Sequence, residues 1–188
     1  MKTHRQALSH LLGITLSATL GLALGTPPAG TPYCFGDGSG AACPCGNTGA
    51  PGHGCANAQN ASGARLTASG TPSVSQDDVN LGLSGLPGAG TAVLYFQGTL
   101  ALGGGQGVPF GDGLRCAGGV VERLGVTLAQ ADGNVFPSTV ALGTLSDLGQ
   151  VPALGGTRYY SAWYRDIAPF CTGATWNLSN GVEVVWTP

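Results

Sequence analysis

The chain has 188 residues, of which 34 are Gly and 12 are Pro, while charged residues make up only 9% and hydrophobic residues 43%. So much Gly and Pro disfavours long helices. The low charge and the ample hydrophobic content exclude a chain that charge repulsion keeps disordered. A chain of this length can bury a core as one domain of ordinary size.

Residues 1–25 have the features of a secretory signal peptide. Lys2 and Arg5 precede an apolar run over residues 11–24, and the small residues Ala23 and Gly25 close the segment. The run is shorter than the roughly 20 apolar residues that a membrane-spanning helix needs. We therefore expect a secreted protein, extracellular or held at the cell surface, with no membrane span once the signal is removed.

The charge of residues 26–188 limits the partners to be expected. This part of the chain contains no Lys, and its five Arg stand against nine acidic residues, a formal balance of −4. Nucleic-acid binding depends mostly on clustered Lys and Arg, and anionic membranes attract the same residues. We expect an extracellular glycan or an envelope protein as partner, and no nucleic acid.

The segment 26–62 is rich in Pro, Gly and Cys and has almost no large apolar side chains. An even number of cysteines in an exported chain predicts a disulfide framework. Four cysteines fall within 22 residues, so we expect two bridges inside 34–55 and a third bridge joining Cys116 to Cys171. The alternative is a metal site, whose ligands are drawn from this cluster. The six cysteines are Cys34, Cys43, Cys45, Cys55, Cys116 and Cys171, and the metal alternative uses Cys43, Cys45, His53 and Cys55.

Residues 63–188 read as a series of short strands separated by Gly, Pro, Asn and Ser. In 78–84, for example, Val79, Leu81 and Leu83 alternate with small or polar residues, which is the period of a strand with one buried face. This pattern predicts an all-β fold, an antiparallel β-sandwich of the jelly-roll or immunoglobulin-like kind. The predicted strands are 65–69, 78–84, 91–98, 114–117, 120–129, 139–144, 158–166 and 182–187. The predicted core is Leu66, Val79, Leu81, Leu83, Val93, Tyr95, Phe96, Val121, Leu124, Val140, Tyr160, Trp163, Val184 and Trp186.

The chain lacks the residue patterns of the common catalytic sites. His53 is the one His after residue 25, and it lies between two glycines inside the cysteine cluster. The Phe-Gly-Asp-Gly string occurs at 35–38 and at 110–113, but one Asp per copy is too few for an oxygen cage around Ca²⁺, so a turn is the expected role. We expect no catalytic residue, no cofactor and no enzyme activity.

The densest group of aromatic and charged residues lies in 158–166. On a strand, Tyr160, Ala162 and Tyr164 face one way and Tyr159, Ser161, Trp163 and Arg165 the other. Exposed aromatic rings beside Arg and Asp can stack on sugars and hydrogen-bond their hydroxyl groups. The candidate ligand-binding residues are therefore Tyr159, Trp163, Arg165 and Asp166. The alternative, which the sequence favours, is that both faces are buried and that Arg165 and Asp166 form a local turn pair.

Five segments carry a resemblance to a group of known proteins. They are YCFGDGSGAACPCGNTGAPGHGCAN (33–57), VLYFQG (93–98), PFGDGLRCAGG (109–119), RYYSAWYRD (158–166) and FCTGATWNLSNGVEVVWTP (170–188). In these motifs and their order the chain resembles exported, Gly-rich, Cys-clustered proteins of planctomycete-type bacteria. The resemblance implies export and a β-rich terminal module, and it transfers no catalytic residue.

These observations lead to three functional hypotheses. The first is a secreted, non-catalytic structural or interaction module of the extracellular space or cell surface. The second is a carbohydrate-binding module. The third is a glycoside hydrolase-like enzyme whose two carboxylates meet only in the folded chain, because such catalysis needs an acid pair.

Overall fold

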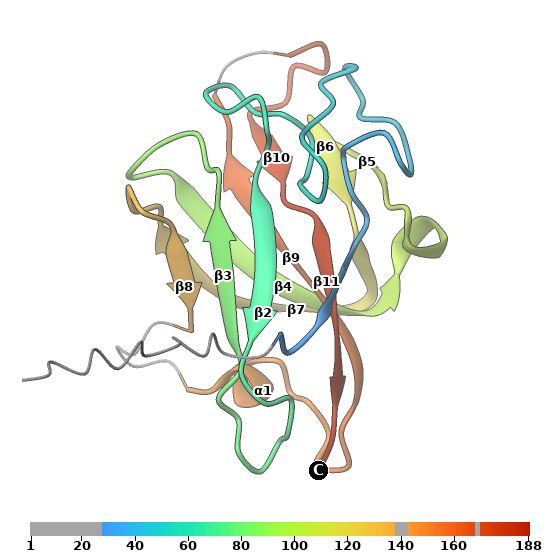
Figure 1. Ribbon diagram of the computed structural model, residues 1–188, viewed down its shortest axis with the longest axis vertical. Helices are drawn as coiled ribbons and strands as arrows, with labels where there is room; N and C mark the ends of the chain where they lie inside the picture. The colour runs from blue at the N-terminus through green and yellow to red at the C-terminus, as the bar shows by residue number, and fades with distance from the viewer. Residues whose placement is uncertain (1–27, 138–142, 168–169) are drawn as a thin grey trace, which may run out of the picture.

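The computed structural model describes residues 28–137, 143–167 and 170–188, and this part of the chain is nearly all β (Figure 1). The signal peptide predicted for 1–25 and most of the strand predicted for 139–144 lie outside the described residues. In the described part, no helix has the length and apolar character to span a membrane. The strands are β1 (Thr31–Tyr33), β2 (Arg65–Ser69), β3 (Asn80–Ser84), β4 (Ala92–Ala101), β5 (Val108–Phe110), β6 (Gly113–Arg115), β7 (Ala117–Leu128), β8 (Asn134–Phe136), β9 (Gly156–Arg165), β10 (Trp176–Leu178) and β11 (Gly181–Trp186); the short helices are η1 (Leu102–Gly105) and α1 (Leu145–Leu148).

The strands form two packed antiparallel sheets and one hairpin. The larger sheet has the order β1-β11-β9-β4-β7, and β10 also pairs with β9; the smaller sheet has the order β2-β3-β8. Figure 1 shows the smaller sheet lying across one face of the larger one. The hairpin β5–β6 is separate from both sheets and lies beside β10. The antiparallel β-sandwich predicted from the sequence is confirmed.

The core lies between the two sheets. Tyr95 of β4 stacks on Phe136 of β8 with ring centroids 4.5 Å apart, and the Trp186 indole N–H donates to the Tyr160 hydroxyl over 2.9 Å. Of the predicted core residues, Val140 lies outside the described residues. The prediction that Val121 and Trp163 belong to the core is wrong. Both lie on the opposite face of the larger sheet and are only partly buried. Phe96 is buried, but on that same outer face. The other predicted core residues are buried between the sheets: Leu66, Val79, Leu81, Leu83, Val93, Tyr95, Leu124, Tyr160, Val184 and Trp186.

The six cysteines form three disulfides, but the predicted pairing is wrong for two of them. The bridges are Cys34–Cys116, Cys43–Cys55 and Cys45–Cys171. Only Cys43–Cys55 lies inside 34–55, and Cys116 does not pair with Cys171. The reason is spatial: β1 pairs with β11, which brings the cysteine-rich segment alongside the hairpin β5–β6 and the chain before β10.

These bridges also exclude the thiolate metal site considered for this segment. Cys43, Cys45 and Cys55 are all oxidised, so none of them offers a thiolate to a metal. Three disulfides are typical of a protein that works in an oxidising environment outside the cytoplasm. The cysteine-rich segment is thus covalently joined to the rest of the chain at Cys116 and at Cys171.

Candidate functional site

The outer face of the larger sheet, which the smaller sheet does not cover, carries an unusual row of apolar side chains. The register places Trp163 of β9 opposite both Leu94 of β4 and Leu178 of β10. Leu94 in turn lies opposite Val126 of β7, which is 64% exposed. A sheet face turned to water is normally polar. This one carries hydrophobic side chains across four strands.

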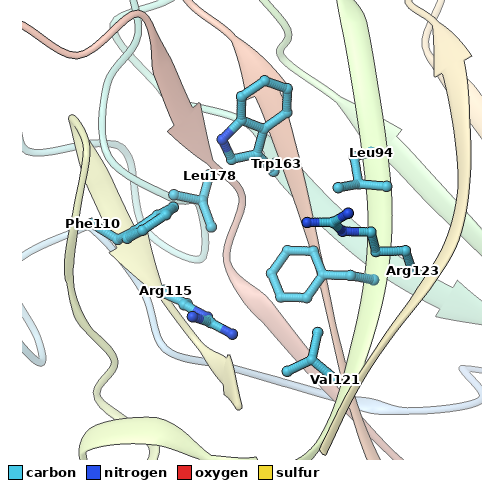
Figure 2. Close-up of a pocket in the computed structure, with 8 residues that line it drawn as sticks. Leu94, Phe110, Arg115, Val121, Arg123, Trp163 and Leu178 are labelled. Atoms are coloured by element: carbon cyan, nitrogen blue, oxygen red, sulfur yellow. The ribbon is translucent and has the colours of Figure 1, made fainter.

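A groove of 390 Å³ lies over this row. Its floor is formed by β4, β9 and β10, one wall by the hairpin β5–β6, and the other wall by β7. Figure 2 shows Trp163 at one end, with Arg115 and Arg123 reaching in from opposite walls. The volume falls in the range of small-molecule and oligosaccharide sites. The lining residues are Leu94, Phe96, Phe110, Arg115, Val121, Arg123, Trp163 and Leu178.

Three aromatic rings lie in a row beside one another. Phe110 and Trp163 line the groove, and Trp176 lies near both of them but outside its lining. Phe110 lies 5.9 Å from Trp176, and Trp176 lies 6.5 Å from Trp163, measured between ring centroids. Phe110 is 41% exposed at the hairpin tip, so its ring faces water. Aromatic rings held in this way are suited to stack on the apolar faces of flat ligands such as sugar rings.

Two arginines are held against these aromatic rings. The Arg115 guanidinium lies 5.9 Å from the centroid of Phe110, and the Arg165 guanidinium lies 5.5 Å from that of Trp163. Arg115 also donates from Nε to the Ala117 carbonyl, and Arg165 from Nη1 to the Thr175 hydroxyl. Cation–π contacts and hydrogen bonds of this kind restrict the rotamers of the long side chains. The guanidinium groups are therefore positioned before a ligand arrives.

The structure separates the four residues singled out as candidate ligand-binding residues. Trp163 lines the groove and Arg165 packs on its ring. Tyr159 faces the same side but lies beside Tyr33, with ring centroids 5.6 Å apart, and does not line the groove. Asp166 is fully buried and accepts a hydrogen bond from the Ala58 amide instead of forming a local pair with Arg165. The favoured expectation that both faces of this strand are buried is wrong, because Arg165 is exposed and Trp163 only partly buried.

Of the residues that line the groove, sequence reasoning proposed only Trp163 as a ligand-binding residue. Among those that it missed, Phe110, Arg115 and Arg123 matter most for binding. Phe110 and Arg115 belong to strands of three residues, which are too short to show an alternating pattern. Arg123 lies at a bulge of β7, where the register to β4 shifts and the alternation changes phase. The sequence did contain one indication of the two arginines in the groove. Only five Arg follow residue 25, and two of them, Arg115 and Arg123, lie close together in the sequence around Cys116.

Two buried carboxylates, Asp112 and Asp166, lie behind the groove and do not line it. Burial raises the pKa of Asp166, and the charge of Asp112 raises it further. Hydrogen bonds from the Ala58 amide and the Asn177 side chain lower this pKa and offset part of the rise. Asp112 accepts a hydrogen bond from the Thr172 hydroxyl, and its Oδ2 is buried with no hydrogen-bond partner in the structure. Both residues are fully buried, so neither carboxylate reaches a ligand in the groove.

Among the described residues, those that line the groove include no histidine and no acidic residue. In the part of the chain that the structure describes, no group of three or more His, Cys, Asp or Glu residues is arranged to hold a metal ion. The His53 ring lies on the cysteine-rich segment, with Nδ1 3.0 Å from the Pro51 carbonyl. The chemistry that the groove offers is stacking, cation–π contact and donation from guanidinium groups.

Comparison with known proteins assigns no function to this groove. The chain matches no protein-family model, no curated protein and no solved structure. The function of this protein is therefore inferred from the groove itself.

Proposed function

We propose that this protein is a secreted, non-catalytic carbohydrate-binding module that acts outside the cell or on its surface. Secretion is supported by the signal-peptide pattern of residues 1–25 and by the three disulfides. The observation that carries the binding proposal is the partly exposed Trp163 in a groove whose walls hold Phe110 and two arginines.

This combination suits a sugar ligand better than a purely apolar one. A pyranose has an apolar face that stacks on an aromatic ring and hydroxyl groups at its edge that accept hydrogen bonds. Trp163 and Phe110 offer the rings, and the arginines offer multiple N–H donors in a fixed plane. The groove residues come from rigid strands, which keeps the cost of ordering them on binding low.

The lining also favours binding over hydrolysis. Glycosidases need two carboxyl groups flanking the scissile bond, one of them as acid. Of the described residues that line the groove, none is acidic. The buried pair Asp112 and Asp166 is shielded from it. A binding module that holds an enzyme or the cell on a polysaccharide requires no such carboxylates.

The test is titration of the oxidised chain, from residue 26 onward, with a panel of soluble oligosaccharides in a calorimeter. We expect saturable binding to one class of glycan, and we expect Trp163→Ala to weaken it at least tenfold, because stacking on an aromatic ring contributes about 0.5–1.5 kcal/mol beyond the area that it buries. The Tm of Trp163→Ala should change by only a few degrees, since this ring lies outside the sandwich core.

Tyr159→Ala is the matched control. This tyrosine lies on the same strand and the same face but outside the groove, so its loss should leave glycan affinity unchanged. Binding that Tyr159→Ala and Trp163→Ala weaken equally would place the ligand elsewhere on the sheet. Absence of binding across the panel would contradict the proposal and favour a structural module.

A further inference from the structure

The distribution of charge around the groove indicates the charge of its ligand, an inference that rests on the proposed function. Residues 26–188 contain only five Arg and no Lys. Two of the five, Arg115 and Arg123, line the groove, and a third, Arg165, packs on the Trp163 ring at its end. Nine acidic residues lie in the same part of the chain, and none of them lines the groove. A protein with an excess of acidic residues thus gathers most of its positive charge at one site.

The positive charge of this site is not neutralised by the hydrogen bonds that the arginines make. Arg115 donates to a backbone carbonyl and Arg165 to a hydroxyl, which are both neutral acceptors. Arg123 is exposed on the opposite wall. Each guanidinium has five N–H donors, so most of them remain available to a ligand. Like charges that converge on one groove without a counter-charge repel each other, and an anion between them removes that repulsion.

We infer that the groove recognises acidic saccharides, with a carboxylate or sulfate group of the sugar between Arg115 and Arg123 and its ring stacked on Trp163. Both anions accept hydrogen bonds from a planar guanidinium in pairs, which a lysine cannot reproduce. The apolar floor of the groove lowers the effective dielectric around a bound anion, which strengthens these contacts.

Other polyanions fit the site less well. Nucleic acid binds through many phosphate contacts along an extended basic surface, whereas this protein offers two arginines in the groove and a third beside Trp163, with a net negative charge elsewhere. The volume of 390 Å³ suits a few sugar units and not a duplex. The chemistry of the site is therefore that of a short acidic glycan segment.

The experiment compares glycans that differ only in charge. Polygalacturonate and its fully methyl-esterified form test the carboxylate, and carrageenan and its desulfated form, a galactan without carboxylates, test the sulfate. For the preferred anion we expect at least tenfold tighter binding to the charged member, and an affinity that falls as NaCl rises from 50 to 500 mM. Arg115→Gln and Arg123→Gln should each remove about tenfold of the affinity for the charged member and little of that for the neutral one.

Arg65→Gln is the matched control, because Arg65 is an exposed arginine on the smaller sheet, away from the groove. It should leave both affinities unchanged. Binding that depends on Trp163 but is equal for charged and neutral glycans would overturn this inference and leave the proposed function standing. Failure of every glycan would overturn both. Equal or tighter binding of a single-stranded oligonucleotide, lost in Arg115→Gln, would replace the saccharide with nucleic acid.

Discussion

Two aspartates on the cysteine-rich side of the molecule meet opposite electrostatic environments. Asp166 is fully buried, and the loss of water around it raises the pKa of its carboxyl. Asp37 lies at the surface, where hydrogen bonds from Ser39, chiefly from its hydroxyl, and from the Gly52 amide lower the pKa of its carboxyl. The folded protein thus favours the protonated form of Asp166 and the ionised form of Asp37.

The raised pKa of Asp166 predicts how this residue affects stability as the pH changes. Because the folded state binds this proton more tightly than the unfolded state does, the contribution of Asp166 is fully present below its ordinary pKa of 3.8 and is lost as the pH rises through the folded value. We expect Asp166→Asn to unfold at a urea concentration near that of the wild type at pH 3.5, and to become relatively more stable as the pH rises to 7.

Asp37→Asn serves as the control with the opposite sign. The lowered pKa of Asp37 stabilises the fold above its ordinary value of 3.8, and this contribution is lost as the pH falls through the folded value. The variant should therefore lose stability relative to the wild type above pH 4. Urea unfolding curves from pH 3.5 to 7.5, taken as differences from the wild type, test both. A difference for Asp166→Asn that is constant with pH would contradict the prediction.

At the scale of single elements, strand β9 shows what sequence alone could establish. Its ten residues are long enough for the alternation to separate buried Tyr160 and Tyr164 from outward-facing Trp163 and Arg165. Strands β1, β5, β8 and β10 have three residues each and were missed, because so short a run has no period to recognise. The groove was missed for a related reason: its residues come from six strands, and only the folded arrangement of these strands brings them together.

Where the cysteine-rich segment meets the end of β10, position 54 has room only for glycine. A Cβ atom on Gly54 would lie 2.4 Å from the Leu178 carbonyl oxygen, which is backbone and cannot turn aside. We expect Gly54→Ala to lower the free energy of unfolding by about 1–3 kcal/mol, the usual cost of overpacking a buried contact. Chemical denaturation of the oxidised protein measures this loss.

Gly40→Ala is the control for this glycine, because it lies in the same segment and its added Cβ would meet nothing closer than 3.5 Å. Its stability should stay within about 0.5 kcal/mol of the wild type, as for most surface substitutions. Equal losses in the two variants would mean that glycine matters here for chain flexibility and not for close packing.

For the whole molecule, the two long-range disulfides determine how the cysteine-rich segment is attached. Their cysteines are 82 and 126 residues apart, against 12 for Cys43–Cys55. In the chain-entropy account, bridges over such distances each stabilise the fold by roughly 5 kcal/mol, and the short one by about 3 kcal/mol. Sequence could predict that the cysteines pair, but the pairing depends on which loops the two sheets bring together, and spacing does not contain that information.

We expect replacement of Cys45 and Cys171 by Ala to lower the free energy of unfolding by roughly 5 kcal/mol, because it reopens the longest loop. A loss under about 1 kcal/mol would show that this bridge contributes little. The pairing itself is checked by trypsin, which cleaves after Arg. The peptide that ends at Arg65 carries four cysteines, 116–123 carries Cys116, and 166–188 carries Cys171. The structure requires all three to be linked in one species, whereas a Cys116–Cys171 bridge would release the first peptide alone.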